Sequence, residues 1–160
     1  MTNPDVLARI DALQIKYQRA LDGADMTGWL DCFGEKDASY ICTTRENEEQ
    51  NLPLALMMDD SYDRLKDRVR FITEVWSGTY EDYQTRHFVQ RLDCADKGAG
   101  LYAVASNFMV AYTSARGRSE ILAAGIYQDE ISLAGNGAKF KSKKAILDTV
   151  ATPRYLVYPV

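Results

Sequence analysis

The apolar residues near the start of the chain recur every three or four positions, which is the spacing of an amphipathic helix. The first such helix begins after Asn3, an N-cap residue followed by proline, and ends at Gly23. Its apolar face consists of Val6, Ile10, Leu13, Tyr17 and Leu21. A short second helix with Trp29 on its apolar side follows, and Gly34 ends it.

The next part of the chain mixes a strand, a loop and a longer helix. Residues 38–44 are predicted to form a strand, and residues 45–51 a polar, acidic loop. This polar segment leads into residues 52–58, an apolar run that is unusual for a loop. A third helix is predicted over residues 61–75, because its apolar residues form one stripe and the two aspartates before it suit the positive end of a helix.

After Gly78 the apolar period changes to two, which is typical of strands. Four long strands are predicted, at residues 85–94, 101–114, 119–132 and 138–149. Glycine-containing turns join them into an antiparallel meander. The order of the elements along the chain, with helices first and strands afterwards, predicts an α+β fold, and we expect residues 1–160 to form a single domain. A long curved sheet over N-terminal helices forms a cone, which can hold a pocket or pack against a partner.

The last nine residues, 152–160, are apolar but contain two prolines, so they do not continue the sheet interior. Two arrangements keep such a tail out of water. It either folds back over its own core or packs against another subunit. We expect this tail and the apolar run 52–58 to be buried between subunits.

Composition and charge narrow the class of partner. The hydrophobic and charged fractions, 46% and 26%, are those of a globular protein, and the net charge of −4 argues against nucleic acid. One dense basic stretch contains Lys139, Lys141, Lys143 and Lys144. Their alternation predicts one solvated strand face.

The cysteines and the N-terminal residues favour a cytoplasmic protein without a membrane segment. Cys32, Cys42 and Cys94 are odd in number and lack C-x-x-C spacing, which fits reduced thiols. The first residues lack the basic and apolar regions of a secretion signal, and no apolar run approaches 18 residues.

The single histidine, His87, limits the chemistry that this chain can perform. A mononuclear iron site uses two histidines and a carboxylate, and a Rieske cluster uses two cysteines and two histidines. One histidine supplies neither. The motifs of dinucleotide, nucleoside triphosphate, serine hydrolase and zinc protease sites are also absent. We therefore assign no catalytic, cofactor-binding or metal-binding residue.

The alternative is acid–base chemistry centred on His87. Paired with a carboxylate such as Asp129, or with Tyr127 or Tyr40, His87 would move a proton, as small cone-shaped isomerases and dehydratases do. In the structural interpretation, His87 is a strand residue whose ring binds a backbone carbonyl or an interfacial carboxylate.

Several segments, in the same order, resemble the β subunits of Rieske-type aromatic-ring-hydroxylating oxygenases. They are Trp-Leu-Asp-Cys-Phe at 29–33 followed by Tyr40, Leu-Lys-Asp-Arg-Val at 65–69, Thr-Arg-His-Phe-Val at 85–89, Ser-Asn-Phe-Met-Val at 106–110, and the lysine-rich segment 139–148. Residues 43–47 and 52–57 look most like members that act on aromatic acids, such as the salicylate 5-hydroxylase small subunit and, more distantly, that of terephthalate dioxygenase.

This resemblance implies a cystatin-like, nuclear-transport-factor-like cone and a structural role in an assembly of three α and three β chains. The α subunit of such an oxygenase carries the Rieske [2Fe–2S] cluster and the mononuclear Fe(II), and receives electrons from a ferredoxin or reductase. No cofactor is expected in the β chain. The ring substrate, the position hydroxylated, the choice between mono- and dioxygenation and the electron donor are determined by the other chains.

Overall fold

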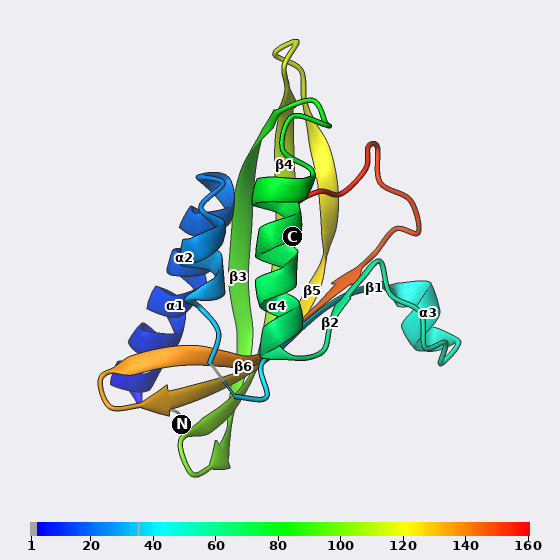
Figure 1. The fold of residues 1–160 in the computed structure, drawn as a ribbon. Helices are drawn as coiled ribbons and strands as arrows, with labels where there is room; N and C mark the ends of the chain where they lie inside the picture. Colours follow the sequence, from blue (N-terminus) through cyan, green and yellow to red (C-terminus); the bar gives the residue numbers. More distant parts are fainter. Residues whose placement is uncertain (1–2, 35) are drawn as a thin grey trace.

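One strongly curved sheet dominates the computed structural model, which describes residues 3–34 and 36–160 (Figure 1). Within these residues, six strands lie in the order β2-β1-β6-β5-β4-β3. Their bounds are β1 Ser39–Thr44, β2 Met57–Asp59, β3 Tyr83–Gly98, β4 Leu101–Ser114, β5 Ser119–Ala134 and β6 Gly137–Leu147. The four long strands form the predicted antiparallel meander, while β1 pairs in parallel with β6 and makes the sheet mixed.

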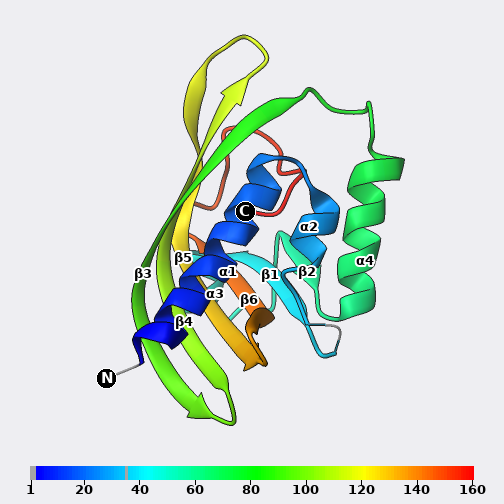
Figure 2. The same ribbon diagram turned by 90° about the vertical axis from the view of Figure 1, so that its left-hand side faces the viewer.

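The helices α1, α2 and α4 lie on the concave side of this sheet. Figure 2 shows α1 lying in the hollow of the curved strands, with α2 and α4 beyond it. The helical elements are α1 Pro4–Asp22, α2 Met26–Leu30, α3 Arg45–Glu49, α4 Tyr62–Arg70 and the π-helical turn η1 Phe71–Val75. Asn3 caps α1 as predicted, with its side chain accepting a hydrogen bond from the Asp5 amide. No helix in the described part of the chain has the length and apolarity needed to cross a membrane.

The core lies between α1, α2 and the concave face. Trp29 on α2 is fully buried and packs edge-to-face on Phe33 and Tyr40, with ring centroids 5.0 and 5.8 Å apart. Tyr17 on α1 packs in the same way on Phe140 of β6, at 5.5 Å. The predicted amphipathic helices are confirmed, because their apolar stripes are the faces that meet the sheet.

Four β-bulges in the described residues help to curve the long strands. The register shifts by one residue at Leu92 and Lys97 of β3, at Leu122 of β5 and at Lys141 of β6. An extra residue on one strand bends that strand and increases its twist. Between the last two bulges, Gly125 lets β5 and β6 approach closely, because a Cβ at this position would lie 1.9 Å from the Ile146 carbonyl oxygen.

The segment between β1 and α4 differs from the prediction. Residues 45–51, predicted as a loop, contain the short helix α3, which Thr44 caps by accepting a hydrogen bond from the Asn47 amide. The apolar run 52–58 ends in β2, the edge strand that pairs with β1. The pattern missed α3 because a five-residue polar helix has no apolar period.

Candidate functional site

A buried polar cluster lies on the concave face where α1 crosses the sheet. The Lys143 ammonium of β6 lies 3.1 Å from Asp129 Oδ2 of β5, and both side chains are fully buried. Gln14 of α1 donates to Asp129 Oδ2 at 2.7 Å, and its Oε1 accepts from Lys143 Nζ at 3.3 Å. The cluster therefore joins the first helix to two central strands.

Aromatic rings surround the ammonium of this cluster. Lys143 Nζ lies 3.6 Å from the Tyr127 ring centroid and 4.5 Å from those of Tyr17 and Phe140. Burial lowers the pKa of Lys143 and raises the pKa of Asp129, and in each case the partner's charge opposes the effect. The polar groups of Lys143, Asp129 and Gln14 therefore bind one another, and the surrounding aromatic rings enclose the ammonium group.

The predicted solvated face of residues 139–144 is wrong for Lys143. Phe140 pairs with Ile131 and Ser142 pairs with Glu130, so Lys141 is the extra residue of the β6 bulge. The bulge reverses the alternation of faces, which leaves Lys141 exposed and turns Lys143 inward.

His87 of β3 forms a pair with Asp22, the last residue of α1. His87 Nδ1 lies 2.6 Å from Asp22 Oδ1, and the His87 amide donates to Asp22 Oδ2 at 3.0 Å. Thr85 Oγ1 donates to Asp22 Oδ1, also at 3.0 Å. Burial alone would raise the pKa of Asp22, but the hydrogen bonds from His87 and Thr85 lower it. In this arrangement the Asp22 carboxylate accepts a hydrogen bond from Nδ1–H of His87, and Nε2 is the second nitrogen of the ring.

The three partners proposed for His87 from the sequence are wrong. Asp129 binds Lys143, Tyr40 binds Val160, and the Tyr127 hydroxyl has no hydrogen-bond partner within the described residues. His87 Nε2 is likewise buried without such a partner. His87 also helps to line an open depression of about 420 Å³ at the β3 edge of the sheet. An aspartate–histidine pair can accept a proton, but Nε2 has no second acid or base beside it.

The tail turns back into the cone rather than projecting from it. The Val160 carbonyl oxygen accepts hydrogen bonds from Tyr17 Oη at 2.8 Å and Tyr40 Oη at 3.1 Å, and the Val160 amide donates to Tyr40 Oη. Val157 and Val160 are buried. Burial raises the pKa values of both tyrosines, so they remain neutral donors. For residues 157–160, burial between subunits is therefore wrong, and the fold-back arrangement holds.

A ring cluster holds the preceding residues of the tail. The Arg154 guanidinium carbon lies 4.6 Å from the Tyr83 ring centroid and 5.3 Å from that of Tyr112. The hydroxyls of Tyr80 and Tyr158 are 2.8 Å apart. The tail is thus fixed to the start of β3 and the end of β4.

Exposed apolar side chains gather where residues 52–58 meet residues 148–156. We call this the loop surface, and its members are between 40% and 62% exposed: Leu52, Leu54, Leu56, Met58, Val150 and Tyr155. A groove of about 330 Å³ lies between the two segments. Figure 1 shows the segment after β6 and the helix α3 on the same side of the molecule.

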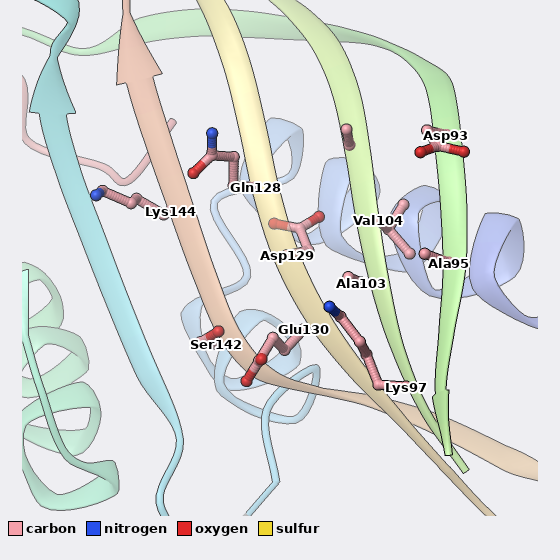
Figure 3. Close-up of a pocket in the computed structure, with 11 residues that line it drawn as sticks. Asp93, Ala95, Lys97, Ala103, Val104, Gln128, Asp129, Glu130, Ser142 and Lys144 are labelled. Carbon is pink, nitrogen blue, oxygen red and sulfur yellow. The ribbon is translucent and has the colours of Figure 1, made fainter. Parts of the chain in front are cut away.

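A second groove, of about 490 Å³, crosses strands β3 to β6 on the face opposite α1 (Figure 3). Its floor contains the small residues Ala95, Ala103 and Ala105. Charged side chains of both signs surround it, among them Lys97 and Glu130. The residues that line this groove include no histidine or cysteine.

The residues that the structure describes include no group of three His, Cys, Asp or Glu side chains that could hold a metal ion. A Rieske cluster does not fit this chain, since it takes two histidines and the sequence has one. Cys32 and Cys42 are buried, and burial raises their thiol pKa values to about 11 and about 12. Such thiols stay protonated and unreactive.

Comparison with known families identifies the chain. Residues 18–153 match the family model described as ring hydroxylating beta subunit. The chain belongs to this family. As a ring-hydroxylating β subunit, it is a component of an aromatic oxygenase, and the resemblance found in the sequence is confirmed.

Individual relatives agree with this assignment. The chain is 28% identical to the anthranilate 1,2-dioxygenase small subunit of Burkholderia cepacia, over 92% of this chain and 90% of the relative. It is also 28% identical to the terephthalate 1,2-dioxygenase terminal oxygenase component subunit beta 2 of Comamonas sp, over 95% and 97% of the two chains. A crystal structure from Novosphingobium aromaticivorans, assigned as the β subunit of an aromatic-ring-hydroxylating dioxygenase, superposes with a TM-score of 0.80 at 28% identity, covering 90% of each chain. This likeness confirms the predicted cone.

Sequence reasoning missed two polar residues of the clusters described above, and one of them left a signal. Asp22 ends α1, where a negative charge is unfavourable because the helix C-terminus carries partial negative charge. A carboxylate in that position indicates a partner elsewhere, and here the partner is His87. Gln14 gave no such signal, since it differs from other polar helix residues only through its contact with Asp129.

Proposed function

We propose that this β subunit is the structural, non-catalytic component of a Rieske non-haem iron oxygenase that hydroxylates an aromatic acid. The two named relatives are dioxygenases of anthranilate and terephthalate, both aromatic carboxylates. The resemblance of residues 43–47 and 52–57 to the salicylate 5-hydroxylase small subunit favours salicylate as the substrate.

The filled interior of the cone is the observation that supports a structural role best. The Lys143–Asp129–Gln14 cluster and residues 157–160 occupy the space between α1 and the sheet. Their polar atoms bind one another rather than facing a pocket. A cone packed in this way serves as a rigid block for assembly.

The oxidation chemistry then belongs to a larger α subunit. That subunit would hold the Rieske [2Fe–2S] cluster and the mononuclear Fe(II), and would take electrons from a ferredoxin or reductase. We propose an α3β3 assembly in the cytoplasm. The single histidine of this chain supports the division of labour, because neither metal centre can form from it.

Reconstitution with and without this chain tests the proposal. The α subunit is expressed alone and together with the β subunit, and hydroxylation of salicylate, anthranilate and benzoate is measured per iron. We expect the α subunit to form a stable, active oligomer only with its β partner. Full assembly and full turnover of the α subunit alone would contradict the structural role.

The Asp22–His87 pair favours a second candidate, a stand-alone isomerase or dehydratase. In this alternative, His87 Nε2 takes a proton from a substrate while Asp22 holds the ring. The isolated β subunit would then catalyse proton transfer on a cyclic ketone or enol without iron. Absence of substrate turnover by the isolated chain, together with assembly-dependent oxygenase activity, would eliminate it.

A further inference from the structure

The apolar side chains of the loop surface stand on a well-ordered backbone. The Leu54 carbonyl oxygen accepts hydrogen bonds from Thr43 Oγ1 at 2.8 Å and from Asn47 Nδ2 at 3.2 Å. The Leu56 amide donates to the Cys42 carbonyl oxygen at 2.7 Å. These bonds fix Leu54 and Leu56 in outward positions, so their exposure is a built feature of the fold.

The facing segment of the loop surface is fixed at both of its ends. Asp148 forms a salt bridge with Arg45, and Arg154 lies among tyrosine rings. Between these anchors, the Thr149 hydroxyl donates to the Ala151 carbonyl oxygen at 2.8 Å. Val150 projects from this turn into solvent. Two ordered segments therefore present apolar groups side by side.

The groove between the segments has the shape of a receptor for a protruding side chain. It is lined by residues that include Leu56, Val150, Tyr155 and Leu156. Interfaces between subunits place apolar anchors in pockets of this kind and surround them with a polar rim.

The charges beside the groove indicate the sign of the partner. On α3, Glu46 and Glu49 are exposed and form no salt bridge with any described residue. The neighbouring basic side chains already have acidic partners, since Arg45 forms a salt bridge with Asp148 and Lys144 forms one with Glu48. The rim thus keeps an excess of negative charge, which complements arginine or lysine side chains.

We infer that the loop surface is the docking site for the catalytic α subunit, and that it receives an apolar segment of that subunit flanked by basic side chains. This inference rests on the proposed function, which supplies the partner. It adds the surface, the anchor positions and the charge of the segment that binds there.

Variants at exposed positions test the docking site without disturbing the core. Leu54→Asp/Leu56→Asp alters the loop surface, and Phe88→Asp/Ile121→Asp is the matched control on the sheet, at positions 56% and 57% exposed. Each variant is first checked by circular dichroism and thermal unfolding, then titrated with the purified α subunit. We expect at least a tenfold weaker Kd for the loop variant and an unchanged Kd for the control.

The charge variant Glu46→Lys/Glu49→Lys provides an independent readout. Its binding to the α subunit should weaken, and the dependence of Kd on salt concentration should become smaller than for the wild type. An unchanged Kd in the loop variant, or an equal loss in the sheet control, would overturn the inference. A wild-type chain that forms oligomers by itself through this surface, so that Leu54→Asp/Leu56→Asp makes it monomeric, would also overturn it. Failure of the wild type to bind the α subunit would instead count against the proposed function.

Discussion

Lys143 of β6 and Asp129 of β5 are directly paired across the sheet, and they form a salt bridge with no exposure to solvent. The pair lies beneath α1, which contributes Gln14 to the same cluster. Burying an ion pair costs desolvation free energy, which the attraction between the two charges and their hydrogen bonds must offset. The position therefore ties the first helix to the centre of the sheet at one defined register.

Removing one member of this pair should be costly. Lys143→Met leaves a buried carboxylate without its counter-charge, and we expect a loss of about 3–5 kcal/mol in the free energy of unfolding. The double variant Lys143→Met/Asp129→Leu should recover most of that loss, because no charge stays buried. Urea unfolding measures both. A single variant within about 1 kcal/mol of the wild type would show that the pair contributes little.

The Asp22–His87 pair predicts a specific dependence of stability on acid pH. The folded pKa of Asp22 lies below its unfolded value of about 3.9, so the unfolded state binds the proton more tightly. Its stabilising contribution is fully present above the unfolded pKa and is lost as pH falls through the folded pKa. The stabilities of the wild type and Asp22→Asn should therefore differ by a constant amount between pH 6 and about pH 4, begin to converge below about pH 4, and stop changing relative to each other only once the pH is below the folded pKa. A difference that stays constant as the pH falls well below about 4 would contradict the pair's role.

Tyr40 should stabilise the folded-back tail through its hydroxyl. That group donates to the Val160 carbonyl oxygen and accepts from the Val160 amide, both in a buried site. Tyr40→Phe leaves the Val160 carbonyl oxygen and amide without this hydroxyl, and we expect the free energy of unfolding to fall by about 1–3 kcal/mol. Tyr155→Phe, at an exposed position, is the control and should change thermal stability by less than about 0.5 kcal/mol. Equal effects of the two substitutions would argue against a tail held inside the cone.

The close approach of β5 and β6 should make Gly125 intolerant of any side chain. A Cβ would lie 1.9 Å from a carbonyl oxygen of the backbone, which cannot move aside without breaking the sheet. We expect Gly125→Ala to cost about 3 kcal/mol, the upper end of the usual cost of overpacking. Gly137→Ala, whose Cβ would meet no atom closer than 3.7 Å, should leave the stability nearly unchanged. Circular dichroism during chemical unfolding compares the two, and similar stabilities would mean that the strands can separate at Gly125.

Much of this fold could be predicted from the sequence, because long periodic segments report directly on burial. The spacing of Ile10, Leu13 and Tyr17 predicted α1, and the alternation after Gly78 predicted the meander. The inward turn of Lys143 could not be predicted, since a bulge at Lys141 shifts the alternation without any local signal.

The partners of the candidate residues were harder to predict than the elements that carry them. His87 was placed on the correct strand, but Asp22 reaches it across 65 positions of the chain, through the packing of α1 on β3. The destination of the tail was also open, because an apolar segment gains equally from its own core and from another subunit. The hydroxyls of Tyr17 and Tyr40 decide it, since they bind the Val160 backbone inside the cone.

The central claim is that this β subunit supports an oxygenase without taking part in its chemistry. Turnover per iron, measured in the α–β complex reconstituted with His87→Gln, tests it most directly, because glutamine can still donate a hydrogen bond to Asp22. A structural role predicts turnover per assembled complex equal to that of the wild type, with any loss of activity matched by loss of assembly. A fully assembled complex that has lost its turnover would contradict the claim.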